Sequence, residues 1–395
     1  MARLLALLTA VLVVLAACGA PTAAPAPTAA PAPTAAPADA GEPIASGNRE
    51  SETPADGGDR SRLTAELRVY NWTDYIDPDL LDEFEQEYGV RVVLDNFDAN
   101  EDMIAKVRAG GSGYDIVVPS DYAVDIMWRD GLLQPIDKSL LPNLQYIDPE
   151  LLDTYFDPGN IYSIPYMYGI SGIAYNQSFF PNGIDSWAVL FDPAQLEAFR
   201  GQVSMLDDER ETPGAAMRYL GKSVNETDPA ALAEAEALLK AQTPLLAAYN
   251  SSDVNRKLAS GEYVLAHSWS GMAMQARVGL GDEFSGNPDI VFVMPKEGGV
   301  IWMDNLAILQ DSPNAYTAHV FIDFLLRPEI AARNTDYVGY LTPNLAGEEL
   351  LSDEIKELYA AGFAPDEAMY ERLEWIVRSD ETSAFTDLWT AVKGQ

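Results

Sequence analysis

Acidic or hydroxyl side chains stand close to aromatic ones in four short segments of this sequence. The segments are YNWTDY (70–75), VPSDY (118–122), SWSG (268–271) and WMDN (302–305). A carboxylate beside an indole face suits an alkylammonium, because the acid pairs with the charge while the ring contacts the adjacent methylenes. The recurrence of this pairing predicts a binding site for such a cation.

Asp304 is the hardest of these residues to explain by packing alone. It lies inside the apolar run VIWMDNLAIL (300–309), which is typical of a buried β-strand. An isolated carboxylate is costly to bury without a partner. Residues two apart in a strand share a face, so Trp302 and Asp304 are predicted to point the same way, as are Trp72 and Asp74.

A fifth segment, MLDDERET (205–212), adds acids near the start of a predicted helix. Asp208 and Glu211 are three residues apart, which places them on one helical face. Capping and charge placement at a helix N-terminus are the commoner roles for such acids. Packing, capping or solvation at a strand end are structural alternatives for Asp74, Tyr75, Ser120, Tyr122, Trp269 and Trp302.

The elements that must position these residues alternate along the chain. Strand-like patterns occupy 65–72, 91–97 and 114–120, and helical ones follow at 77–90, 100–110 and 121–131. A second block over about 172–294 includes a long helix at 228–250 and a strand at 263–271, before a helix pair at 315–340. This alternation predicts an α/β fold with a largely parallel sheet, whose ligands lie beyond the carboxyl ends of the strands.

The overall composition excludes several kinds of function. The 395 residues are enough for two domains. The 61 acidic and 25 basic residues give a formal net charge of −36, which argues against nucleic-acid binding, since phosphate backbones need basic patches. The only histidines are His267 and His319, so histidine-rich metal sites and most histidine-based catalysis are not expected.

The N-terminus has the pattern of an export signal. Arg3 precedes an apolar run (4–17) that is too short for a transmembrane helix, and the closing LAAC resembles the bacterial lipobox. We therefore predict a signal peptide at 1–17 and lipid attachment at Cys18; the alternative is an ordinary signal peptide with an incidental cysteine. The Ala-, Pro- and Thr-rich start of 18–62 predicts an unfolded tether that holds a soluble body on the outer face of a membrane. Because Cys18 is the single cysteine, no intrachain disulfide is possible.

Eight ordered blocks of the sequence resemble the periplasmic polyamine-binding proteins, the spermidine/putrescine receptors of bacterial ABC uptake systems. The resemblance covers about 67–344, and its blocks are VYNWTDYIDP, YDIVVPSDY, LLQPIDKSLLPN, YSIPYMYG, MLDDERE, PKEGGVIWMDNLAI, FLLRPE and VGYLTPN. It implies a two-lobe periplasmic-binding-protein fold with discontinuous domains joined by a hinge. Lobe 1 would hold 63–172 and 302–349, and lobe 2 would hold 173–301 and 350–395.

The resemblance also implies a function and a set of ligand contacts. The protein would act as a monomeric receptor, without catalysis, cofactor or metal, that captures a polyamine and delivers it to a membrane permease. The implied contacts are Trp72, Thr73, Tyr75, Ser120, Tyr122, Asp208, Glu211, Trp269, Trp302, Asp304 and Tyr340. Asp74 matches an acid of the putrescine-type receptors, and we include it as a twelfth contact.

Two positions depart from the family pattern. Ile376 stands where spermidine-type receptors have a glutamine, and Met272 stands where putrescine-type receptors carry an acid. The separated acids favour spermidine over putrescine. The remaining alternatives are a receptor of the same fold for another solute, an extracytoplasmic hydrolase with two carboxylates, and a stalked adhesion or sensor module. A carboxylate-bearing solute would call for arginine, and only Arg210 occurs in the cleft blocks.

Overall fold

The computed structural model describes residues 59–377 and 383–394. The predicted signal peptide, Cys18 and most of the predicted tether lie outside the described residues. Residues Arg60–Arg62 form a short 3₁₀ helix, and the guanidinium of Arg62 lies 3.7 Å from the ring centre of Tyr316. Residues 59–62 therefore pack against the folded body, and the prediction that the unfolded tether extends to residue 62 is wrong at its C-terminal end.

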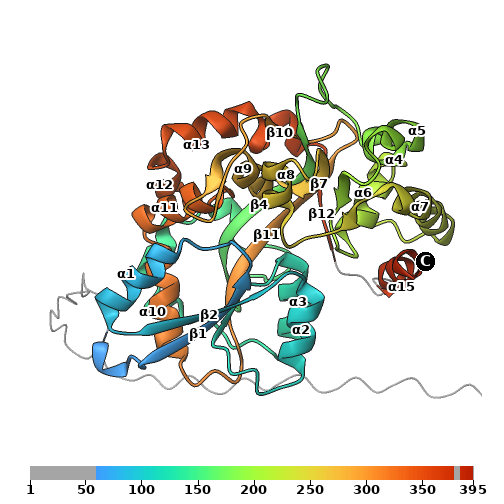
Figure 1. Ribbon diagram of the computed structural model, residues 1–395. Coiled ribbons are helices and arrows are strands. Elements are labelled where there is room, and N and C mark those ends of the chain that lie inside the picture. The colour runs from blue at the N-terminus through green and yellow to red at the C-terminus, as the bar shows by residue number, and fades with distance from the viewer. Residues whose placement is uncertain (1–58, 378–382, 395) are drawn as a thin grey trace, which may run out of the picture. The chain divides into compact units, whose positions relative to one another are not determined.

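The first part of the chain alternates strands and helices as predicted (Figure 1). Its elements are β1 (Glu66–Trp72), α1 (Pro78–Tyr88), β2 (Arg91–Phe97), α2 (Asn100–Arg108), β3 (Ile116–Val117) and α3 (Asp121–Arg129). Strand β1 pairs in parallel with both β2 and β3. The Asp77 side chain caps α1, and Gly89 ends the helix at a φ of 70°, a left-handed conformation that glycine adopts without strain.

Two long strands connect this part of the sheet to the rest. Strands β4 (Ser163–Asn176) and β11 (Gly299–Ile308) pair antiparallel from Ile301↔Ile170 to Ala307↔Ser163. The far end of β11 pairs antiparallel with β3, while the far end of β4 pairs antiparallel with β7. The sheet is thus mixed, and the prediction of a largely parallel sheet misses the two strands that cross between its halves.

The second block completes the sheet with β5 (Val203–Met205), β6 (Ala248–Tyr249), β7 (Leu265–Trp269) and β10 (Ile290–Val293). Its helices are α4 (Ala188–Phe191), α5 (Pro193–Leu196), α6 (Glu211–Tyr219), α7 (Pro229–Gln242), α8 (Val254–Ser260) and α9 (Ser270–Val278), and β8 (Gly279–Leu280) pairs with β9 (Phe284–Ser285). The predicted helix at 228–250 is too long. Proline at 244 cannot donate a backbone hydrogen bond, so α7 gives way to a 3₁₀ turn (Thr243–Leu245) and then to β6.

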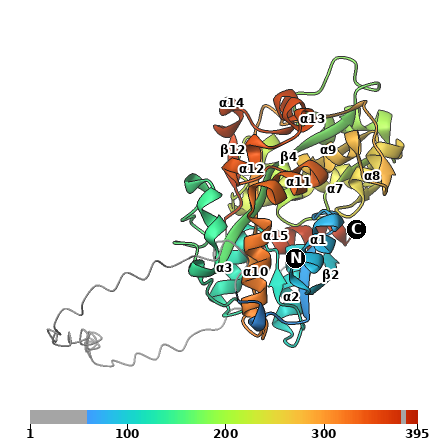
Figure 2. The same ribbon diagram turned by 90° about the vertical axis from the view of Figure 1, so that its left-hand side faces the viewer.

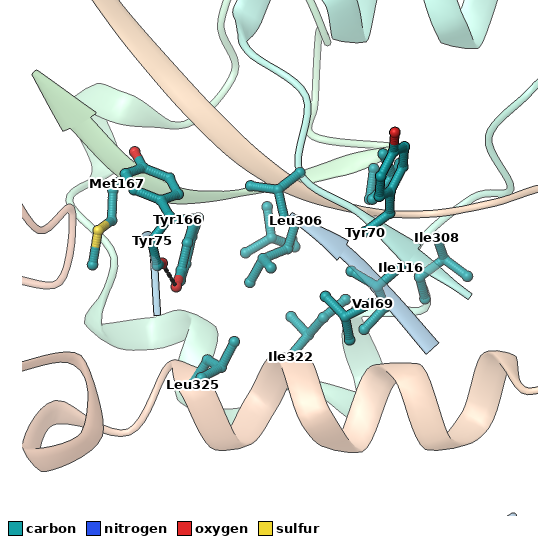
Figure 3. Packing of buried hydrophobic residues seen from close by; sticks show 14 of the residues in the cluster. Val69, Tyr70, Tyr75, Ile116, Tyr166, Met167, Leu306, Ile308, Ile322 and Leu325 are labelled. Atoms are coloured by element: carbon teal, nitrogen blue, oxygen red, sulfur yellow. Dashed lines mark hydrogen bonds between the residues drawn. The ribbon is translucent and has the colours of Figure 1, made fainter. Parts of the chain in front are cut away.

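The returning chain contributes to both halves. The predicted helix pair is present as α10 (Ala315–Leu325) and α11 (Pro328–Val338). It is followed by α12 (Leu345–Glu349), α13 (Asp353–Leu358), a π turn (Tyr359–Phe363), α14 (Glu367–Tyr370), β12 (Leu373–Trp375) and α15 (Ser383–Lys393). Helix α10 lies beside the β1–β3 half, where Ile322 and Leu325 face Val69 and Leu306 (Figure 3), whereas α13 lies beside α9 (Figure 2).

The buried apolar residues form three clusters that follow the two halves. One combines β1–β3 and their helices with the C-terminal part of β11 and with α10. A second joins α4–α7 with Leu388 and Val392 of α15, and a third joins α9 and β10 with α13. The fold is therefore a mixed α/β architecture in which C-terminal segments pack on the second block. The limits given above for the two lobes stay a prediction.

Candidate ligand-binding site

A cavity of about 650 Å³, a volume that includes space open to solvent at its mouth, lies where the carboxyl ends of several strands meet the helices that follow them. Eleven of the twelve predicted site residues line it, and Asp74 alone does not. The other lining residues are Asp98, Asn100, Asp121, Ser251, Met272 and Ile376. None of the described residues that line the cavity is lysine, arginine or histidine.

Aromatic rings form a continuous row along the cavity. The ring of Trp269 lies edge-on to Trp72, with centroids 6.0 Å apart, and to Trp302, with centroids 6.4 Å apart. The row continues from Trp302 to Tyr340 at 5.3 Å and from Tyr340 to Tyr75 at 5.0 Å. Edge-to-face packing of this kind holds the rings rigidly. It provides apolar walls and electron-rich faces suited to a cation with an alkyl chain.

Asp304 meets hydroxyl groups at one end of this row. It is 4% exposed, and the hydroxyl of Ser120 donates to its Oδ1 at 2.6 Å. Asn100 donates in turn to the oxygens of Ser120 (3.0 Å) and Tyr122 (3.2 Å). Burial raises the pKa of Asp304 to about 7, against the effect of the Ser120 hydrogen bond. This carboxylate therefore lacks a positive partner among the described residues.

Asp208 and Glu211 line the cavity from the start of α6. Asp208 Oδ1 accepts hydrogen bonds from the backbone N–H groups of Arg210 (2.7 Å) and Glu211 (2.8 Å), so it caps the helix, which is the commoner role that its position predicts. It nevertheless lines the cavity as well. Burial raises the pKa of Asp208. The two interpretations of this residue are therefore compatible.

One carboxylate oxygen of Glu211 accepts hydrogen bonds, and the other has no partner among the described residues. Its Oε1 accepts from the hydroxyl of Ser171 (2.8 Å) and from Nε1 of Trp269 (3.1 Å), whereas its buried Oε2 has no hydrogen-bond partner among the described residues. The nearest basic nitrogen is Nε2 of His267 at 4.0 Å. Burial lowers the pKa of His267 to about 3, so this histidine is neutral and does not supply the missing charge. Burial, and then the nearby Asp208, raise the pKa of Glu211 to about 8.

Asp121 is a fourth buried carboxylate that the sequence patterns did not single out. Only 1% of it is exposed, and its oxygens accept from the backbone N–H groups of Tyr122 (2.6 Å) and Met303 (3.1 Å). Burial raises its pKa to about 8. The sequence could have indicated Asp121 as a site residue, because it comes directly after Ser120 and therefore also follows the end of a strand, at the start of α3. Asp98 and Asn100, which follow β2, could have been found in the same way.

The prediction that Asp74 shares a face with Trp72 is wrong. Strand β1 ends at Trp72, and Asp74 has a φ of 55°, a left-handed conformation that breaks the alternation of a strand. Its side chain accepts from the guanidinium of Arg256 through both oxygens and from Asn255 at 3.2 Å. The acid thus joins the first part of the chain to α8, beside the cavity, and forms none of its lining.

Arg210, the one arginine of the cleft segments, does not face the cavity. It is 2% exposed, stacks 4.4 Å from the ring centre of Phe385 and donates to Asn225 at 3.0 Å.

Within residues 59–377 and 383–394, no helix combines the length and apolar character needed to cross a membrane. In the same ranges no group of three or more His, Cys, Asp or Glu residues is arranged to hold a metal ion.

Comparisons with known proteins agree across both halves of the chain. A family described as bacterial extracellular solute-binding protein matches residues 79–361. The chain is 41% identical over 314 residues to the spermidine/putrescine-binding periplasmic protein of Escherichia coli (strain K12), which covers 78% of this chain and 86% of the relative. It is 39% identical over 343 residues to the putrescine/cadaverine-binding protein of Pseudomonas aeruginosa, with 85% and 96% covered. A solved structure from Listeria monocytogenes, described as a spermidine/putrescine ABC transporter, matches with a TM-score of 0.76 at 39% identity, over 84% of this chain and 99% of that one.

Proposed function

This chain belongs to the family of bacterial extracellular solute-binding proteins, and on that premise we propose that it captures a polyamine, spermidine in preference to putrescine. One observation carries the proposal. Four buried carboxylates with raised pKa values line an aromatic cavity to which none of the described basic side chains contributes, namely Asp121, Asp208, Glu211 and Asp304. Several ammonium groups on one flexible chain would supply the missing charge.

The wall chemistry supports an alkyl polyamine over other solutes. One ammonium would pair with Asp304 and a second with Asp208 and Glu211, while the methylenes between them lie on the row of rings. A ligand with a carboxylate is disfavoured, because Arg210 lies behind the wall, stacked on Phe385. The apolar side chains of Met272 and Ile376 add non-polar lining without a hydrogen-bonding group of their own.

The preference for spermidine rests on charge. A triamine carries one more ammonium than a diamine, and four buried acids offer it more partners than a diamine can use. Binding makes and breaks no covalent bond. The bound receptor would deliver the polyamine to an ABC importer, acting as a monomer tethered to the outer face of the membrane through lipid on Cys18, with β4 and β11 as the connecting hinge.

Isothermal titration calorimetry with putrescine, spermidine, spermine and lysine tests the proposal. We expect saturable binding of the polyamines with spermidine tightest, and no saturable binding of lysine, whose carboxylate would face the acids of the cavity. Absence of binding by every polyamine would refute the function. Tighter binding of putrescine than of spermidine would refute only the preference.

A further inference from the structure

His267 lies beside the ligand-binding site, on strand β7, whose last residue Trp269 belongs to the row of rings. Its side chain is fully buried, and the ring of Trp187 lies edge-on to it with centroids 5.2 Å apart. Nε2 of His267 lies 4.0 Å from Oε2 of Glu211, which also lines the main cavity. Both residues border a small buried space whose other walls are Ser171, Trp187, Ala215, Arg218, Gly299 and Val300.

The hydrogen bonds of Thr212 indicate which nitrogen of His267 carries the hydrogen. The Thr212 hydroxyl donates its single hydrogen to the carbonyl oxygen of Leu206 at 2.6 Å. Towards Nδ1 of His267, 3.5 Å away, the same hydroxyl can therefore act only as an acceptor. Nδ1 is then the protonated nitrogen, and Nε2 presents a lone pair on the side of Glu211. Burial lowers the pKa of His267 to about 3, so the ring is neutral.

The carboxyl group of Glu211 has one oxygen available to a proton. Its Oε1 accepts from the hydroxyl of Ser171 at 2.8 Å and from Nε1 of Trp269 at 3.1 Å. Its Oε2 and Nε2 of His267 are both buried polar atoms that have no hydrogen-bond partner in the part of the chain that the structure describes. Two buried acceptors without a donor are unfavourable, and a proton on Oε2 would make them a donor and an acceptor.

The negative charges near Glu211 favour this proton. Burial, and then the charge of Asp208 in the turn before α6, raise the pKa of Glu211 to about 8, and Asp121 of α3 acts in the same direction. The hydrogen bonds from Ser171 and Trp269 favour the ionised form and are outweighed.

The two arginines on or beside α6 are engaged elsewhere. Arg218, on the same helix as Glu211, borders the small space, but its guanidinium pairs with Glu374 of β12. The buried Arg210 interacts with Asp208. Since neither guanidinium donates to Oε2 of Glu211, a proton can satisfy this oxygen in the ligand-free protein.

We infer that His267 is a positioning residue for Glu211: in the ligand-free protein Oε2–H of Glu211 donates to Nε2 of His267, and the proton leaves when an ammonium binds. The two atoms would approach from 4.0 Å to about 2.8 Å in the protonated state, the length of an ordinary hydrogen bond. On capture the O–H bond breaks, its electron pair stays on Oε2, the carboxylate pairs with the ammonium, and the proton passes to bulk water. His267 stays neutral throughout. This inference rests on the proposed function and adds that a residue outside the main cavity sets how strongly protons oppose capture.

Nitrogen-15 NMR of the unmodified protein tests the hydrogen bond directly, because the chain has only two imidazole rings. At pH 6 we expect Nε2 of His267 to be the unprotonated nitrogen, and its resonance to shift when saturating spermidine is added. His319 is the internal reference, since its Nδ1 lies 2.6 Å from the carbonyl oxygen of Ala315 and its Nε2 accepts from the N–H of Asp137 at 2.8 Å. Its resonances should not move. A proton on Nε2 of His267, or no shift of that resonance on spermidine binding, would overturn the inference.

Titration calorimetry with spermidine at pH 6 and pH 8.5 tests the effect on capture, using His267→Leu. Loss of the acceptor destabilises the protonated form of Glu211, so spermidine affinity at pH 6 should rise about 2- to 10-fold over the unmodified protein, the range of one neutral hydrogen bond. At pH 8.5 the two proteins should agree within about 2-fold, because both then bind from the ionised state. His267→Gln, whose amide can donate to Oε2, should give the same gain or a larger one. His319→Leu is the matched control, since His319 is also buried and does not line the cavity.

The direction of the change separates the proton from a packing defect. Damaged packing would weaken binding at both pH values, whereas loss of the hydrogen bond strengthens it at pH 6 alone. Unchanged or weaker affinity at pH 6 in both His267 variants, a gain of equal size at both pH values, or the same gain in His319→Leu would overturn the inference. If melting curves show that His267→Leu does not fold, His267→Gln and the NMR measurement decide. Failure of the unmodified protein to bind any polyamine would refute the proposed function, and the position of the imidazole hydrogen in the ligand-free protein would still decide the hydrogen bond.

Discussion

Replacing Asp304 with asparagine should cause the largest loss of polyamine affinity of any single isosteric change in the cavity. The carboxylate is 4% exposed, Ser120 donates a hydrogen bond to it at 2.6 Å, and the Tyr75 hydroxyl lies close enough to lower its pKa as well. An asparagine keeps the shape and an oxygen for the Ser120 hydroxyl, so the change removes mainly the charge. The ammonium at this end would then be buried without its counter-ion.

The size of the affinity loss follows from the burial of the ion pair that Asp304 would form with the ligand ammonium. Removing one partner of a buried ion pair costs about 3 to 5 kcal/mol. We expect the lower end, because three other buried acids (Asp121, Asp208 and Glu211) still attract the ligand. About 3 kcal/mol corresponds to a dissociation constant roughly 150-fold larger.

Stability of the ligand-free protein separates this effect from misfolding. Burial already disfavours the charged form of Asp304, whose pKa is raised to about 7. Asparagine should therefore leave the melting temperature at pH 8 unchanged or higher, while spermidine affinity collapses. The control is Asp82→Asn, an exposed acid on α1 that does not line the cavity. Calorimetry showing Asp304→Asn within 3-fold of the unmodified protein would refute the assignment of an ammonium to this carboxylate.

Three further predictions concern protons, the contact at Asp74 and the aromatic wall. Since the pKa of Glu211 is raised to about 8 and that of Asp304 to about 7, their protonated forms stabilise the ligand-free fold at low pH, and this contribution is lost as the pH rises from about 4 towards 8. The melting temperature of the ligand-free protein should fall over that window. Binding of spermidine at pH 6 should release protons, which is measured from the titration heats in buffers of different ionisation enthalpy. Equal heats in all buffers would contradict the proton release. Arg256→Met removes the contact of the guanidinium with both carboxylate oxygens of Asp74. Because this pair is partly exposed, the dissociation rate of the polyamine should rise about 2- to 5-fold with little change in the association rate. Stopped-flow traces with an unchanged dissociation rate would exclude a role of this contact in retaining the ligand. Trp302→Leu should weaken spermidine about 3- to 30-fold through loss of a cation–π face, and calorimetry showing no loss would mean that the ring only packs.

Much of the site follows from the sequence because strand periodicity is local. Trp302 and Asp304 both line the cavity, as their spacing predicts, since β11 stays extended through both residues. The same rule fails for Trp72 and Asp74, because the strand ends between them and the chain turns into a left-handed conformation. A local sequence pattern does not show where a strand ends when that end depends on a contact with a distant residue such as Arg256.

Other features depend on contacts between distant segments. Asp121 lines the cavity because its oxygens accept from the N–H of Met303, 182 positions away along the chain, and no spacing rule reaches that far. The antiparallel pairing of β4 with β11 likewise depends on which segments cross between the halves. Periodicity identified β11 as a strand and left its direction open, and it did not identify β4 as a strand. The predicted helix at 228–250 was too long for a more local reason, since its apolar pattern continues past the proline at which α7 gives way.

The buried acids also bear on how a receptor of this kind can respond to its ligand. In an empty, closed cavity each of these carboxyl groups is either protonated or ionised without a counter-ion, and both states are unfavourable at neutral pH when the pKa values lie near 7 to 8. An ammonium that pairs with Asp304 or Glu211 removes that penalty only when the walls have closed around it, because an open cleft leaves the acids hydrated. A polyamine would then bind the closed form far more tightly than the open one. Such a difference in affinity is what a ligand needs in order to shift a conformational equilibrium. The acids that destabilise the empty site would therefore also couple polyamine capture to closure.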